Sequence, residues 1–141
     1  QAVTCYGTTN KRITRASIPS IIRYKGITYR VTSVWANAFK NKSRLTTVSI
    51  GNNVSVIGKN AFYKCKKLKK VTIGTGLTQI NSGAFRGVKK GCTITIKSLK
   101  LKKVSSKIDQ STSKICVPRK KYKAYKKILW KKSRTVKIKK F

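Results

Sequence analysis

The feature that most constrains this chain is a repeat of 23 residues. Ala-Phe pairs stand at 38–39, 61–62 and 84–85, and several apolar columns keep the same spacing. These columns are Val34, Ile57 and Ile80; Leu45 and Leu68, with Gly91 in the third copy; Val48, Val71 and Ile94; and Ile50, Ile73 and Ile96. A unit of this size cannot bury its apolar face alone, so we expect stacked copies to form a solenoid with a continuous core.

Each repeat carries one short strand signal. Val48-Ser49-Ile50, Val71-Thr72-Ile73 and Ile94-Thr95-Ile96 alternate apolar and polar residues, as a strand with one buried face does. Glycine-containing turns follow at 51–53 and 74–76. The pattern predicts a parallel sheet of short strands, with apolar columns facing inward and lysines filling the outward positions.

The unit V-x-x-I-x-x-x-A-F-x-x-C-x-x-L-x-x-V-x-I, best developed between Val54 and Ile73, resembles the leucine-rich repeat of the BspA type. That family comprises secreted bacterial surface proteins. The resemblance is clear over 31–96 and weaker toward both ends. It implies an α/β, β-rich leucine-rich-repeat solenoid and a non-enzymatic interaction module, secreted or at the cell surface of a bacterium. The chain departs from the family in two ways, because the Cys65 column holds Lys42 and Val88, and because the usual acids are absent.

We expect three parts along the chain. Residues 1–30 form an N-terminal cap, with a degenerate repeat and a hairpin around Lys25-Gly26 that covers the first strand face. Residues 31–97 hold three repeats of 23 residues. Residues 98–141 hold a long loop or irregular repeat and then a C-terminal cap.

The C-terminal cap is expected to contain a strand at 114–118, a helix at 119–132 and a last strand at 135–139. The helix carries apolar side chains on one side, namely Tyr122, Tyr125, Ile128 and Leu129. This stripe favours a helix that closes the core, and the alternative is a basic amphipathic helix on a membrane surface. Trp35 is open to two interpretations, packing against the hairpin or ligand binding.

The four cysteines are Cys5, Cys65, Cys92 and Cys116. They form no C-x-x-C pair and have no histidine partner, so the spacing indicates neither a metal site nor a redox motif. Cys65 is expected to be a buried free thiol. The possible disulfide is Cys92–Cys116.

Composition argues against an enzyme. The chain has no histidine, and Asp109 is its only carboxylate, so carboxylate-pair, Ser-His-Asp and Cys-His sites cannot be assembled. Zinc, calcium and magnesium sites lack ligands for the same reason, and we expect no cofactor. A Ser-Lys dyad is conceivable, but with 28 lysines every serine lies near one. No apolar run approaches the roughly 18 residues of a transmembrane segment.

The charge directs attention to polyanions. The chain holds 36 Lys and Arg residues and a formal charge of +35. Stacked strands lie about 4.8 Å apart, so repeated cations would form ladders. The candidate polyanion-binding residues are Arg44, Lys66, Lys67, Lys69, Lys70, Lys89 and Lys90, in which Arg44, Lys67 and Lys90 form one ladder and Lys66 and Lys89 a second. Ser49, Thr72 and Thr95 form a candidate hydroxyl column on the outward strand face, with Thr47, Lys70 and Thr93 beside it.

Several functions remain open. The leading hypothesis is a cationic adhesion or protein-binding module whose partner is an anionic polymer or an acidic protein surface. Sequence-independent nucleic-acid binding is the alternative, because charge alone gives salt-sensitive affinity, although no nucleic-acid-binding motif is present. A scaffold piece with no ligand of its own is the third, because threonine favours strands and lysine keeps surfaces soluble.

Overall fold

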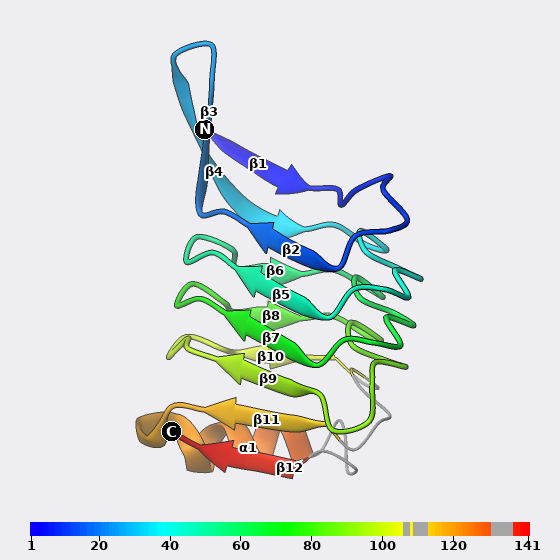
Figure 1. Cartoon of the computed structure of the whole chain (residues 1–141). Helices are drawn as coiled ribbons and strands as arrows, with labels where there is room; N and C mark the ends of the chain where they lie inside the picture. The colour runs from blue at the N-terminus through cyan, green and yellow to red at the C-terminus, as the bar shows by residue number, and fades with distance from the viewer. Residues whose placement is uncertain (106–107, 109–112, 131–136) are drawn as a thin grey trace.

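The chain winds into a solenoid in which successive coils stack on one another (Figure 1). The computed structural model describes residues 1–105, 108, 113–130 and 137–141. Its elements are β1 (Ala2–Cys5), β2 (Arg15–Ile18), β3 (Ile21–Tyr24), β4 (Ile27–Val34), β5 (Thr47–Ile50), β6 (Val56–Ile57), β7 (Lys70–Ile73), β8 (Gln79–Ile80), β9 (Thr93–Ile96), β10 (Lys103–Val104), β11 (Lys114–Val117), a 3₁₀ turn (Arg119–Lys121), α1 (Tyr122–Trp130) and β12 (Lys137–Lys140). The predicted β-rich solenoid with a helical C-terminal cap is confirmed.

Two sheets, rather than the one expected, line the solenoid. The predicted sheet runs in the order β2-β5-β7-β9-β11-β12, and a second runs β1-β4-β6-β8-β10 with β3 beside β4. All pairs within these two paths are parallel, and only β3 and β4 pair antiparallel. Three strands of the second sheet are only two residues long, too short to show alternation in the sequence.

The repeated apolar columns form the core between the sheets. Phe39, Phe62 and Phe85 stack in a column, with ring centroids 5.2 and 5.4 Å apart and ring planes tilted by 8° and 1°. Identical residues at one position of each coil can repeat the same packing, because parallel pairing keeps the coils in register.

The third repeat departs from the leucine column by one residue. Leu45 and Leu68 are fully buried, but Gly91 is exposed with φ +77°, and Cys92 takes the buried position. The amides of Leu68 and Cys92 close equivalent turns, to the carbonyls of Cys65 and Lys89. One extra residue therefore separates the turn from the core in this coil.

The predicted Cys92–Cys116 disulfide is not formed. Cys92 points into the core ahead of β9, on the same side as Ile94 and Ile96. Cys116 pairs in register with Thr95, between the buried Ile115 and Val117, so its side chain faces outward. Since successive strand residues alternate faces, the two sulfurs lie on opposite sides of the sheet. Cys65 is a buried free thiol, as expected, and donates to the Phe39 carbonyl at 3.1 Å.

The hairpin forms where predicted but does not cover the strand face. Lys25 (φ +46°) and Gly26 (φ +75°) make the two-residue turn between β3 and β4, as a type I′ hairpin requires. Figure 1 shows this hairpin projecting beyond the coil stack, and Ile21, Ile22 and Tyr24 on it remain exposed. Residues 2–5 and 15–18 instead form the end coil, with one strand in each sheet. Trp35 contacts Tyr6 of that coil, centroid to centroid at 5.3 Å, and not the hairpin.

The C-terminal helix closes the opposite end. Tyr125 and Leu129 on α1 are buried, which favours the capping interpretation over a membrane-facing one. The Tyr125 hydroxyl accepts a bond from the Leu101 amide (2.9 Å) and donates to the Ser98 carbonyl (3.1 Å). The 98–113 segment contributes β10 and the buried Leu101, so it is an irregular coil in its described part. Of the last predicted strand, 137–139 lie in β12, whereas 135 and 136 fall outside the described residues.

Candidate functional site

The outward face of the longer sheet brings the predicted hydroxyl column together. Ser49 pairs in register with Thr72, and Thr72 with Thr95. Ser49 is exposed, while the two threonines are partly buried. The hydroxyls therefore repeat at the strand spacing, about 4.8 Å.

The same row is longer than the sequence indicated. Ser17 pairs with Ser49 across β2 and β5, and Cys116 and Lys139 continue the row on the other side. Ser17 was missed because the inserted hairpin places it 32 residues before Ser49 instead of one repeat before. The row thus carries four hydroxyls and ends in a lysine.

A second outward row runs beside the first and carries cations. Its members, in strand order, are Arg15, Thr47, Lys70, Thr93, Lys114 and Lys137. The predicted trio Thr47, Lys70 and Thr93 is in register, and the end strands add three cations that sequence spacing did not reveal. A polymer lying across the strands would meet hydroxyls in one row and cations in the next.

Four of the predicted lysines line one groove at the turns that lead into these strands. Lys66, Lys67, Lys69 and Lys89, together with Thr46, enclose a cavity of about 340 Å³, which we name the lysine groove. All four lysines are exposed. Arg44, Lys70 and Lys90 are also exposed but do not line the groove.

The predicted ladder Arg44–Lys67–Lys90 loses its register at the third step. Arg44 and Lys67 immediately precede the buried Leu45 and Leu68. In the third coil Gly91 precedes the buried Cys92, so Lys90 is one residue further from the core. The extra residue in this turn is the cause.

A separate cationic cluster surrounds Tyr63 on the Ala-Phe turns. Lys40 Nζ lies 5.9 Å, Lys64 Nζ 5.3 Å and the Arg86 guanidinium carbon 5.9 Å from the ring centroid. These distances are within the range of cation–π attraction. Positions 40, 63 and 86 recur at the repeat spacing, which is the signal that could have revealed this column.

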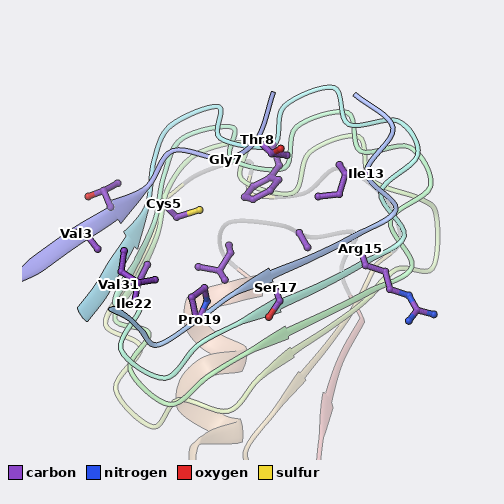
Figure 2. A pocket seen from close by; sticks show the side chains of 14 residues that line it. Val3, Cys5, Gly7, Thr8, Ile13, Arg15, Ser17, Pro19, Ile22 and Val31 are labelled. Atoms are coloured by element: carbon purple, nitrogen blue, oxygen red, sulfur yellow. The ribbon is translucent and has the colours of Figure 1, made fainter. Parts of the chain in front are cut away.

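An apolar pocket opens at the N-terminal end of the solenoid, and sequence reasoning did not anticipate it. Its volume is about 310 Å³, and Figure 2 shows Val3, Cys5 and Ile13 pointing into it from the end coil. Phe39 also lines it. Burial raises the pKa of the Cys5 thiol, which disfavours the thiolate. We name this cavity the N-terminal pocket.

The described residues include no group of three His, Cys, Asp or Glu side chains that could hold a metal ion. Within the same residues, no helix has the length and apolar character needed to cross a membrane.

Comparisons with known proteins identify relatives of the fold. The sequence model of the "BspA type Leucine rich repeat region" matches residues 12–125 in six copies. A leucine-rich repeat protein from Bacteroides capillosus has a similar structure, with 22% identity, a TM-score of 0.62, and coverage of 92% of this chain and 78% of that one. The T. pallidum leucine rich repeat protein is 20% identical, with a TM-score of 0.57 and coverage of 82% and 62%. The curated proteins contain no match.

Proposed function

Because the chain belongs to the BspA-type leucine-rich repeat family, we propose that it is a non-enzymatic interaction module, secreted or held at a bacterial cell surface, that engages anionic polymers or acidic partners. The family supports an interaction role, and the charge of +35 supports the anionic partner. Such a module attracts its partner over a distance and then holds it through local contacts.

The lysine groove is the observation that carries this proposal. Four ammonium groups, on Lys66, Lys67, Lys69 and Lys89, line one cavity formed by two successive coils. A single carboxylate, Asp109, cannot neutralise 36 cations, so the groove depends on solvent counterions or on a partner. Displacing counterions from clustered lysines favours binding of a polyanion.

The outward rows of the longer sheet extend the same surface. Lys69 in the groove immediately precedes Lys70 of the second row, and Thr72 of the hydroxyl row follows on the same strand. Phosphate, sulfate or uronate groups of a polymer would contact the cations. Its sugar or backbone hydroxyls would pair with Ser49, Thr72 and Thr95.

The test compares two variants of equal charge. The groove variant replaces Lys66, Lys67, Lys69 and Lys89 with Gln; the matched variant replaces the exposed Lys97, Lys100, Lys102 and Lys103, which lie outside the groove. Retention on an immobilised anionic wall polymer of the teichoic-acid type is measured for both. We expect the groove variant to lose roughly tenfold in affinity and the matched variant far less. Equal losses would show that net charge, and not the groove, holds the polymer.

A further inference from the structure

The N-terminal end of the solenoid leaves two strand edges and one cavity uncovered. β1 and β2 are the terminal strands of the two sheet paths at this end. The N-terminal pocket lies between them and reaches inward to Phe39 (Figure 2). At the other end of the chain α1 covers the core, so the two ends differ.

The pocket exists because the end coil lacks an aromatic residue for the core column. Phe39 is the first phenylalanine of the sequence, so its ring stacks on Phe62 on one side only. In the later coils this position holds another ring about 5 Å away. A volume of about 310 Å³ is at the small end of ligand pockets, which suits one large apolar side chain.

The backbone of β2 is prepared to pair with a further strand. The carbonyls of Thr14 and Ile18 accept bonds from the amides of Thr46 and Gly51, toward β5. Alternate residues of a parallel strand direct their backbone groups to the same neighbour, so Arg15 and Ser17 direct theirs to the open edge. Such an edge can accept an extended peptide by strand addition.

Charge and exposed apolar surface both indicate what kind of segment fits. Six of the eight large apolar side chains that are exposed in the described part of the chain lie in the first 35 residues; the six are Tyr6, Ile21, Ile22, Tyr24, Ile27 and Trp35. This concentration is typical of an interaction surface. Arg15 is exposed on the outward face beside the open edge, where an opposing carboxylate could pair with it. A second copy of the chain would add another +35 to this end, so like charges disfavour self-association.

We propose that the N-terminal end binds an extended acidic peptide segment, which adds a strand beside β2 and inserts one aromatic side chain into the N-terminal pocket above Phe39. Strand alternation places the acidic side chains of that segment on the outward face near Arg15 and its apolar side chains inward. The groups that bind are the backbone of Arg15 and Ser17, the Arg15 guanidinium and the apolar walls of the pocket. None of them belongs to the lysine groove.

The test uses two synthetic peptides of equal charge, Glu-Phe-Glu-Val-Glu and Glu-Ser-Glu-Ser-Glu, each capped at both ends. Affinities for the full chain are measured by calorimetry at about 0.3 M salt, which screens diffuse attraction to the basic surface. Burial of the phenylalanine and valine should make the first peptide bind roughly tenfold tighter or more. Equal affinities would overturn the proposal without any variant.

Three variants then locate the site. Ala16→Leu fills the N-terminal pocket, and Ser17→Pro removes the amide directed to the open edge while keeping the β5 pairing. Both should abolish the difference between the two peptides, and Arg23→Glu, an exposed arginine on β3 outside the pocket, should preserve it. Thermal unfolding confirms that each variant folds. A difference that survives in Ala16→Leu and Ser17→Pro would overturn the proposal, as would a stable dimer of the wild-type chain in sedimentation.

Discussion

Phe62 shows how one residue of the repeat supports the coils on either side of it. Its ring is fully buried and stacks on both Phe39 and Phe85. We expect Phe62→Ala to lower the free energy of unfolding by about 3–5 kcal/mol, because the ring leaves a cavity between two coils. Urea denaturation measures the loss. Lys66→Ala, on the exposed surface of the same repeat, should change it by less than about 0.5 kcal/mol, and similar losses in both would contradict this packing.

Cys65 makes the stability of the chain depend on alkaline pH. Burial raises the pKa of its thiol from 9.0 to about 11, although Lys42 opposes the shift. The folded state therefore holds the proton more tightly than the unfolded state. The resulting stabilisation is complete below pH 9 and is lost as pH rises toward about 11.

Cys65→Val is the matched variant for this effect, since the next repeat has the buried Val88 in the same column. Between pH 9 and 11 the free energy of unfolding of the wild type should fall relative to that of Cys65→Val. Denaturant unfolding at several pH values measures both proteins, and subtracting one from the other removes the shared titration of the lysines. Parallel pH curves would show that the Cys65 thiol is not shifted.

At the scale of the element, α1 depends on one buried hydroxyl. The Tyr125 hydroxyl pairs with the Leu101 amide and the Ser98 carbonyl, which attaches the helix to the irregular coil. Burial raises the pKa of this phenol, so it stays protonated as a donor. Tyr125→Phe leaves both backbone groups unpaired and should cost about 1–3 kcal/mol. The Leu101 amide should then exchange its hydrogen faster, whereas unchanged exchange would show that this bond does not hold the helix.

The elements that could be predicted are those whose period is intact. Val48, Val71 and Ile94 gave the longer sheet and its register because strand alternation and the repeat agree there. The second sheet could not be predicted, since strands such as Val56–Ile57 are too short to alternate. The turn before Cys92 was displaced because one extra residue breaks the period without changing its composition.

The same limits apply to the candidate site. The hydroxyl row and the lysines of the groove follow from spacing, because parallel pairing turns sequence repetition into spatial rows. Ser17 and Arg15 were missed because the hairpin is inserted between their strand and the next. The N-terminal pocket arises from a residue type that the end coil lacks, and an absence in one coil gives no positive pattern in the sequence.

Over the whole molecule, charge and apolar surface are separated. Lysines cover the coils and their turns, whereas the exposed apolar side chains concentrate at the N-terminal end, where residues 1–10 carry no charged side chain. This separation gives the chain two surfaces of different chemistry. Diffuse attraction acts on the lysine-rich coils, and apolar burial with strand pairing acts at the end coil.

The measurement that tests the central claim most directly is binding of the intact protein to three anionic polymers across a salt series. The polymers are a phosphate polymer of the teichoic-acid type, an acidic glycan and duplex DNA. All three should weaken as salt rises, because lysine contacts release counterions. A specific surface of groove lysines and strand hydroxyls predicts that one polymer keeps a clear preference at about 0.5 M salt, where charge attraction is largely screened. One steep slope shared by all three polymers, with no preference left at high salt, would contradict it.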